Sequence, residues 1–243
     1  KKKNLNDHKV KVVDHKEIFK GLSDFTPTFN PRCIEALLHR IPGLSERFIY
    51  FNDDMFLIQK TKKEDWFRDA ATPVLRGKWS QSYNKLWYKK AASLLFPFWK
   101  KRPSYNLAQS LSANMAGYNN KYYKSFHSGR PLLRSVFEEY FNKNPQTLHN
   151  QLKYRFRHQD QFIPYSLGWH LMIKKEGTAL ESILGLEEIT NIKKLSIGKF
   201  KNLLNQAVQD PKIFSLNIQD LSQGEKKIQD YFKLWMTKLL EED

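Results

Sequence analysis

The sequence predicts an α/β fold, and three features indicate it. Short β-type runs at residues 10–13, 48–51 and 212–216 are separated by stretches with helical periodicity. Each of these runs is followed by acidic, amide or histidine side chains. In open α/β sheets, ligands bind just beyond the carboxyl ends of the strands. We therefore expect one central sheet that contains the three runs, with their polar ends meeting in one cleft.

Composition limits the class of protein. The chain has 243 residues, of which 40% are hydrophobic, so it can bury a core. Its 41 Lys and Arg against 25 Asp and Glu give a net charge of +16, which predicts attraction to nucleic acid, to another phosphate-containing polymer or to an anionic membrane. The one cysteine, Cys33, excludes an internal disulfide and a cysteine-rich zinc site. No apolar run is long enough to span a membrane and the start resembles no signal peptide, so we expect a cytoplasmic protein.

The first run ends at Asp14-His15, and a helix is predicted to begin at Pro31. Its apolar positions, at helical spacing, are Ile34, Leu37, Leu38 and Ile41. Glu35 and His39 share the opposite face with i, i+4 spacing, which is typical of a solvated pair and also allows a functional one.

The second run, residues 48–51, leads directly into Asn52-Asp53-Asp54. Adjacent carboxylates repel each other unless they are solvated or bind a cation, so this position suits Mg²⁺ or Mn²⁺. The alternative interpretation is a polar turn between two strands, because Asn and Asp are common turn residues.

Residues 61–121 predict an inserted helical subdomain in which aromatic and basic residues alternate. The aromatic residues are Trp79, Tyr83, Trp87, Tyr88, Phe96, Phe98 and Trp99, followed by basic residues at 100–102. This composition suits stacking of single-stranded nucleic acid, sugar rings beside phosphates, or a small helical core with a basic exterior.

Two later stretches suggest anion binding. His127 lies in a loop that is predicted to precede an amphipathic helix starting at Leu132, and a helix N-terminus favours anions. His127 is then a general base, a phosphate contact or an ordinary loop histidine. In residues 153–160, Arg155 and Arg157 would share one face if the chain were extended, which suits phosphate or a solvated basic surface.

The last run, residues 212–216, is followed by Asn217-Ile218-Gln219-Asp220 and then by a predicted C-terminal helix. Inward positions of that helix are Ile228, Phe232, Trp235 and Leu239. The chain has no P-loop, dinucleotide glycine motif or nucleophile-elbow sequence, which argues against the corresponding enzyme classes.

Taken together, these stretches resemble the Stealth family of sugar-phosphate transferases. The resemblance is carried by residues 13–19, 27–30 and 34–35, by His39 through Asp54, by Ser125 through Asp160, and by residues 213–217. The family's first block, a strand with Thr-Trp-Val-Asp-Gly, is missing, so we expect a partial catalytic domain. Within it we expect the second block at 1–60, the insertion at 61–121, the third and fourth blocks at 122–220 and a terminal helix at 221–243.

The resemblance implies a Rossmann-like, glycosyltransferase-A-like mixed sheet flanked by helices. It also implies transfer of hexose-1-phosphate or N-acetylhexosamine-1-phosphate from a UDP-sugar to an acceptor sugar hydroxyl, with formation of a phosphodiester and release of UMP. The acceptor would be an anionic, phosphodiester-linked capsular polysaccharide, and peripheral contact with the inner face of the cell membrane is compatible with the charge.

Site residues follow from the same resemblance. The residues implied as catalytic are Glu35, Asp54, His127, Arg155 and Arg157. Those implied to bind substrate are Asn30, His39, Asn52, Asp53, Arg130 and Asn217, and the metal ligands are Asp54, Asn217 and Asp220, where two residues separate the amide from the last acid. The competing hypothesis is a non-enzymatic basic module for a polyanion such as nucleic acid, which explains neither Glu35 nor Asp54.

Overall fold

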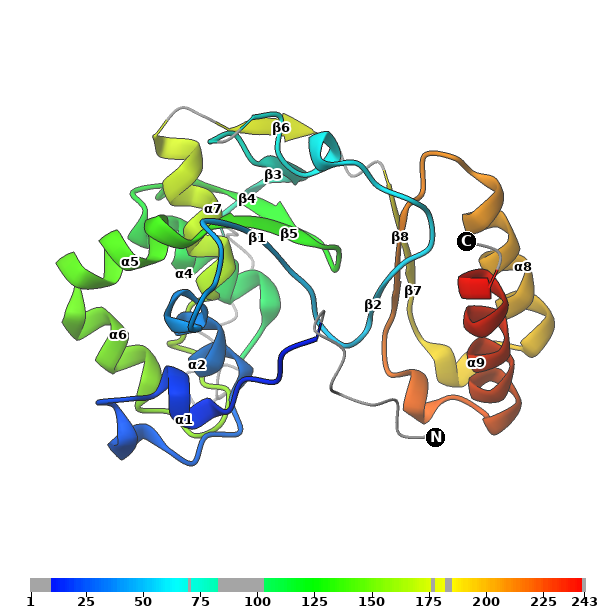
Figure 1. Ribbon diagram of the computed structural model, residues 1–243, viewed down its shortest axis with the longest axis horizontal. Coiled ribbons are helices and arrows are strands. Elements are labelled where there is room, and N and C mark those ends of the chain that lie inside the picture. The colour runs from blue at the N-terminus through cyan, green and yellow to red at the C-terminus, as the bar shows by residue number, and fades with distance from the viewer. Residues whose placement is uncertain (1–9, 70, 83–102, 176–177, 182–184, 242–243) are drawn as a thin grey trace, which may run out of the picture. The chain divides into compact units, whose positions relative to one another are not determined.

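A computed structural model describes residues 10–69, 71–82, 103–175, 178–181 and 185–241 (Figure 1). These residues form two compact units, which are described separately. The first contains residues 10–48, 79–82, 103–124 and 132–175, and the second contains 49–69, 71–78, 125–131, 178–181 and 185–241.

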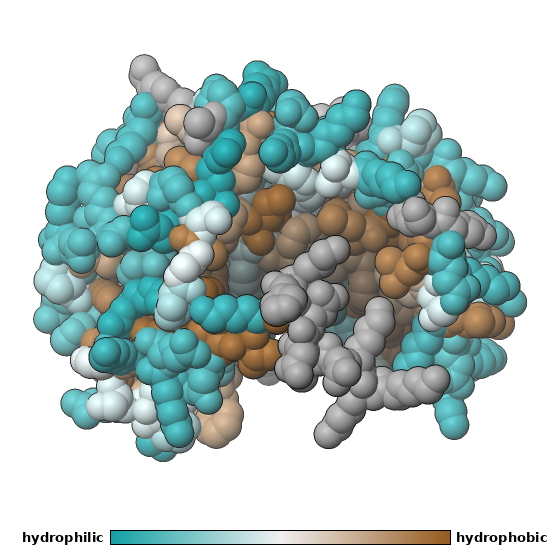
Figure 2. Space-filling view, viewed as in Figure 1, coloured by the Kyte–Doolittle hydropathy of each residue, from teal (hydrophilic) through white to brown (hydrophobic). Residues whose placement is uncertain are grey.

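The first unit is mainly helical. Its helices are α1 (His15–Ile18), α2 (Pro31–Ala36), α4 (Tyr105–Met115), α5 (Arg134–Lys143), α6 (Pro145–Leu152) and α7 (Pro164–Lys174). Helix α7 packs against α4, α5 and α2, and its Trp169 is fully buried. Exposed residues cluster on the outward sides of α5 and α6, where Figure 2 shows mostly hydrophilic side chains.

The second unit is built on a three-stranded sheet of β2 (Met55–Leu57), β8 (Ser215–Ile218) and β7 (Leu186–Ile189). Strand β8 is central, antiparallel to β2 and parallel to β7. Helices α8 (Ile197–Gln209) and α9 (Lys226–Glu241) lie beside this sheet in Figure 1. Leu216 and Ile218 of β8 share a core with Phe200 of α8 and Phe232 of α9.

Five further strands complete the described β structure. Strand β1 (Arg47–Tyr50) pairs with β5 (Arg130–Leu133), and β3 (Val74–Gln81) lies between β4 (Lys121–Ser125) and β6 (Ala179–Glu181), parallel to β6. Strands β1, β3, β4 and β5 each contain residues of both units. No helix among the described residues is both long and apolar enough to cross a bilayer.

The α/β class is confirmed, but the expected single central sheet is wrong. Residues 10–13 form no strand, because Asp14 is the N-cap of α1 and its carboxylate accepts a hydrogen bond from the Lys16 backbone N–H. The other two runs do form strands, but β1 and β8 belong to different sheets.

Several expected boundaries also shift. Strand β8 covers 215–218 instead of 212–216, so Asn217 lies within the strand and not after it. Leu132 and Leu133 belong to β5, and α5 begins only at Arg134, so His127 does not lie at a helix N-terminus. Helix α2 begins at Pro31 as predicted, but it ends at Ala36 and a 3₁₀ turn contains His39.

The insertion predicted for 61–121 is not helical throughout, because it contains β3 as well as α4. Its aromatic and basic residues between 83 and 102 lie outside the described part of the chain. The terminal helix, predicted for 221–243, is α9 and begins only at Lys226, after a 3₁₀ turn at Leu221–Gln223. Ile228 and Phe232 are buried, and Trp235 and Leu239 are partly buried against the same core, as predicted.

Candidate functional site

On the side of the β2–β8–β7 sheet that faces away from the α8/α9 core, polar side chains lie beside the apolar Leu57 and Leu186, which are both in register with Ser215. Asn217 of β8 is in register with Met55 of β2 and Glu188 of β7, so these three side chains share one side of the sheet. Ser215 lies on the same side, two residues before Asn217. We call Met55, Glu188, Ser215 and Asn217 the polar sheet face.

Asp54 is attached to this face by its backbone. Asn52 to Met55 form a turn in which the Asn52 carbonyl accepts from the Met55 N–H at 3.3 Å, and Asp53 is exposed at its tip. The Asp54 carbonyl accepts from the Ile218 N–H at 3.1 Å and from Asn217 Nδ2 at 2.9 Å. The turn predicted as an alternative is therefore present, and it brings Asp54 to the central strand.

Three buried oxygen atoms here have no hydrogen-bond partner among the described residues. They are Asp54 Oδ1, Asn217 Oδ1 and Ser215 Oγ. An unsatisfied buried polar group costs about 1–3 kcal/mol, so each such oxygen calls for an explanation. Asn114 Oδ1 and Ser166 Oγ of the first unit also lack a partner among the described residues, so the grouping of three such oxygens is what marks this place. A carboxylate and an amide oxygen are ligands that Mg²⁺ accepts, and the donor set fits such an ion.

Asp220, the third predicted ligand, has a different environment. It adopts a left-handed backbone with φ 55°, precedes a 3₁₀ turn and is exposed. Its carboxylate accepts from Gln223 Nε2 at 3.1 Å. Within the described ranges no three His, Cys, Asp or Glu side chains gather as a metal-binding group, and Mg²⁺ commonly uses only one or two protein carboxylates with substrate phosphates.

His127 lies beside Glu188 of the polar sheet face. Its backbone N–H donates to Glu188 Oε1 at 3.0 Å, and its Nδ1 is 3.4 Å from the same oxygen. Gln219 Nε2 is 3.2 Å from that Nδ1. If Nδ1 carries the proton and faces Glu188, Nε2 is a base; if Nδ1 accepts from Gln219, Nε2 is a donor.

Arg130 is fully buried in the second unit. Its Nη2 donates to the Phe126 carbonyl at 3.1 Å, and its guanidinium lies 5.8 Å from the centre of the Tyr50 ring. The neighbouring Gly129 leaves no room for a side chain, because a Cβ there would be 2.5 Å from Phe51 and 2.6 Å from Trp66. The loop that carries His127 is thus fixed by packing.

The remaining predicted residues lie in the first unit, where Asn30 is the N-cap of α2. Asn30 Oδ1 accepts from the Arg32 N–H at 3.2 Å, and Nδ2 donates to the Tyr154 carbonyl at 3.0 Å and to Gln161 Oε1 at 2.8 Å. Gln161 Nε2 donates to the Gln151 carbonyl at 2.9 Å. Asn30, predicted to bind substrate, therefore joins α2 to residues 153–163.

Glu35 is buried, which excludes the solvated pair with His39. Next to it, burial lowers the pKa of Arg32, the Arg157 charge lowers it further, and the Glu35 charge opposes both effects. Arg32 Nη1 also donates to the His158 carbonyl at 3.1 Å. The negative charge of Glu35 thus stabilises the buried positive charge of Arg32, whether or not Glu35 also takes part in catalysis.

Burial, followed by the nearby Arg40 charge, lowers the pKa of His39 to about 4. Its ring stacks on Phe141, with ring centres 5.6 Å apart, so it is neutral at pH 7 and packed as an aromatic residue. Arg155 and Arg157 are both exposed, in an irregular segment and not a strand. Beside them Phe29 and Phe156, also exposed, stack with ring centres 5.7 Å apart.

Four residues of these sites were not singled out by the sequence. Glu188 follows another acid in a short β-type run, and Arg32 and Gln161 have no distinctive spacing. Gln219 stands in the segment after residue 216, but glutamine is common on any surface. Only the register of β7 with β8, and the packing of residues 153–163 on α2, identify them.

The fold is that of a mixed α/β protein, and its central strand β8 carries two of the three buried oxygens that lack partners among the described residues. Residues 3–75 match the profile of Stealth protein CR2, conserved region 2. The chain is 34% identical to the capsular polysaccharide phosphotransferase fcs1 of Haemophilus influenzae, over 68% of this chain and 44% of that protein. It is 26% identical to the exopolysaccharide phosphotransferase cps2G of Lactiplantibacillus plantarum, over 91% of this chain and 68% of that protein.

A capsular polysaccharide phosphotransferase of Actinobacillus suis is 28% identical over 82% of this chain and 51% of that protein. The chain therefore belongs to the Stealth family, as its sequence motifs indicated. It spans only about half the length of two of these three relatives.

Proposed function

We propose that the protein is a capsular polysaccharide phosphotransferase that moves hexose-1-phosphate or N-acetylhexosamine-1-phosphate from a UDP-sugar to a sugar hydroxyl. The acceptor oxygen attacks the phosphorus that carries the donor sugar. The bond from this phosphorus to the bridging oxygen breaks, UMP leaves, and the hydroxyl proton passes to a base. The observation that carries the proposal is the polar sheet face, where buried oxygens of Asp54 and Asn217 lack partners.

In this proposal Asp54 and Asn217 hold Mg²⁺ or Mn²⁺, while Asn52 and Asp53 line the diphosphate end of the donor. When bound, the ion neutralises phosphate charge. Asp220 is a weaker candidate, because its carboxylate already accepts from Gln223. Phosphoryl transfer depends mainly on positioning and on charge neutralisation, which suits a site that offers oxygens and little else.

His127 acts as acid/base or as a phosphate donor, and Glu188 and Gln219 position its ring. Proton transfer to Nε2 requires that Nδ1–H faces Glu188, and the 3.4 Å separation of these atoms supports that arrangement. Arg130, fully buried, fixes the His127 loop through the Phe126 carbonyl, and we assign it a positioning role rather than direct contact with the substrate.

For the first unit we propose that Arg155 and Arg157 bind phosphate, since both guanidiniums are exposed and one fork can contact two phosphate oxygens. Glu35 is kept as an active-site carboxylate that also stabilises Arg32. Asn30 and His39 are better explained as residues that hold this surface in place, because their side chains are engaged in the protein interior.

The acceptor proposed here is an anionic phosphodiester-linked polysaccharide, to which a chain of net charge +16 is attracted. A cytoplasmic location with peripheral contact to an anionic membrane belongs to the same proposal. The proposal also includes a Rossmann-like, glycosyltransferase-A-like organisation of the fold. The parallel strand pairs β3–β6 and β7–β8 are compatible with it.

The test is a transfer assay on the natural protein that contains this chain. A panel of UDP-sugars is incubated with Mg²⁺ and phosphodiester oligosaccharides, UMP is quantified by chromatography, and the new diester is followed by ³¹P NMR. Asp54→Asn should lower turnover at least about 100-fold, the scale of losing one charge-stabilising group. Asp230→Asn, which changes an exposed acid on α9, is the matched control.

The polyanion-binding alternative predicts another result. In that case no UDP-sugar releases UMP, and RNA is retarded in gel-shift experiments with an affinity that falls steeply as salt rises. If the wild type transfers sugar phosphate and Asp54→Asn does so at the same rate, the polar sheet face has no part in the mechanism.

A further inference from the structure

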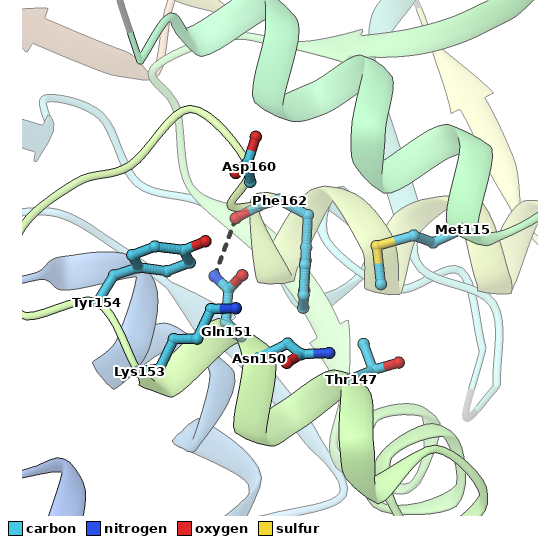
Figure 3. Close-up of a pocket in the computed structure, with 8 residues that line it drawn as sticks. All are labelled: Met115, Thr147, Asn150, Gln151, Lys153, Tyr154, Asp160 and Phe162. Carbon is cyan, nitrogen blue, oxygen red and sulfur yellow. Dashed lines mark hydrogen bonds between the residues drawn. The ribbon is translucent and has the colours of Figure 1, made fainter.

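The first unit contains a pocket of about 360 Å³ that none of the roles above uses (Figure 3). Helix α6 contributes Thr147, Asn150 and Gln151, helix α4 contributes Met115, and the segment between α6 and α7 contributes the rest. The lining residues of that segment are Lys153, Tyr154, Asp160 and Phe162. Ligand pockets measure about 300–1,000 Å³, so this one suits a small ring and not a long polymer segment.

The aromatic wall of the pocket is held in place. Tyr154 stacks on His158 with ring centres 4.1 Å apart and planes inclined by 6°, and His158 Nδ1 lies 3.3 Å from Asp160 Oδ2. The Tyr154 carbonyl also accepts from Asn30 Nδ2. His158 covers one side of the Tyr154 ring, and the Lys153 ammonium lies 5.1 Å from the ring centre, so a ligand that stacks on Tyr154 would take the place of this ammonium beside the ring. Figure 3 shows Tyr154 and Lys153 next to Gln151 in the pocket.

The polar groups of the pocket are mixed in kind. Asn150 offers both a donor and an acceptor, Thr147 a hydroxyl, Lys153 an ammonium and Asp160 a carboxylate. One positive and one negative charge balance, which does not favour an anion such as phosphate. Gln151 is 2% exposed, and its Oε1 has no hydrogen-bond partner among the described residues while its Nε2 donates to the Phe162 carbonyl at 3.0 Å.

A fixed aromatic face beside several neutral donors and acceptors fits a neutral polyhydroxyl ring. We propose that this pocket binds one pyranose ring of the acceptor saccharide, with the ring stacked on Tyr154 and its hydroxyls bonded to Asn150 and Asp160. The inference rests on the proposed function, because that function requires an acceptor made of sugar rings.

The test measures sugar binding without requiring turnover. Methyl glycosides of glucose, galactose, N-acetylglucosamine and N-acetylgalactosamine are titrated into the full protein and followed by saturation-transfer NMR. Asn150→Ala should raise the dissociation constant of the bound glycoside about fivefold, the effect of one hydrogen bond, and Tyr154→Ala about tenfold or more through lost stacking. Asn142→Ala, an exposed amide on α5 away from the pocket, should leave it unchanged.

Asn150 is exposed on α6, so its replacement tests the pocket even if Tyr154→Ala folds poorly. Equal binding in Asn150→Ala and Asn142→Ala, or no binding of any of the four glycosides, would overturn the inference. UDP-sugar binding, measured in the same samples, should not change in the pocket variants. Failure of the wild type to bind any UDP-sugar would contradict the proposed function while leaving the sugar pocket standing.

Discussion

The two units each bury a side-chain amide completely, and they use it differently. In the first unit, Gln161 Oε1 accepts from Asn30 Nδ2 at 2.8 Å and from the His158 N–H at 2.9 Å, and Nε2 donates to the Gln151 carbonyl. In the second unit, Asn217 donates once, to the Asp54 carbonyl, and its oxygen has no partner. Both residues are 0% exposed.

This difference distinguishes buried polar groups that stabilise the fold from buried polar groups that are available to a ligand. A satisfied network in the interior strengthens a single arrangement of the chain, here the attachment of residues 153–163 to α2. Oxygens left without partners lower stability and are therefore expected where a ligand supplies the missing contact. On this view Asn30 and Gln161 of the first unit position Arg155 and Arg157, whereas Gln151 Oε1 of the first unit and the oxygens of Asp54 and Asn217 of the second lack partners and are available to a ligand.

Among the substitutions, the largest expected effect on stability is on the network of the first unit. Gln161→Leu leaves the His158 N–H and one Asn30 donor without an acceptor, so we expect the free energy of unfolding to fall by about 3 kcal/mol. Urea denaturation followed by circular dichroism measures it. Gln206→Leu, at an exposed position of α8, is the control, and equal stability of the two variants would show that the network is dispensable.

The same substitution in the other unit sharpens the contrast. Asn217→Leu removes one hydrogen bond and an unsatisfied oxygen together, so the free energy of unfolding should change by less than about 1 kcal/mol. A loss as large as that of Gln161→Leu would mean that both amides are structural.

Acid should also destabilise the first unit. Burial lowers the pKa of both His39 and His170 to about 4, whereas the ordinary value is 6.5. The unfolded chain then binds more protons between these values, so stability is complete above pH 6.5 and falls as the pH drops toward 4, by up to about 1.4 kcal/mol per pH unit for each histidine.

His39→Phe, which preserves the stack on Phe141, should remove about half of this slope, because one of the two histidines no longer titrates. The control is His15→Gln, which replaces an exposed histidine and should leave the pH dependence of stability unchanged. Urea unfolding at a series of pH values gives the slope, and an identical slope in His39→Phe and the wild type would contradict the burial argument.

Part of this account could be predicted from the sequence. The propensities of residues 48–51 and the proline at residue 31 indicated β1 and the start of α2, and the polar turn at Asp54 was one of two stated interpretations. The presence of the α5 helix was predicted correctly, but its start was not. Leu132 and Leu133 fit the apolar pattern of a strand as well as that of a helix, and they belong to β5.

The rest depends on contacts between distant residues. Asp54 and Asn217, 163 residues apart, were expected at one site from the family resemblance and from the polar ends of their runs, and not from local pattern alone. Nothing in the sequence indicated that β7 supplies Glu188 to His127. Residues 10–13 look like a strand, but the cap at Asp14 starts a helix and no neighbouring strand pairs with them among the described residues. Tertiary context thus decided the sheets, whereas local signals in the sequence indicated helices α2, α5 and α9.

The central claim is that Asp54 and Asn217 leave oxygens for a divalent cation. The most direct measurement is Mn²⁺ binding by electron paramagnetic resonance on the full protein with UDP present, in the wild type, Asp54→Asn and Asp230→Asn. Asp54→Asn keeps the shape of the side chain and removes its charge, so Mn²⁺ affinity should fall at least about tenfold, while Asp230→Asn should match the wild type. Equal Mn²⁺ affinity in all three proteins would contradict the claim.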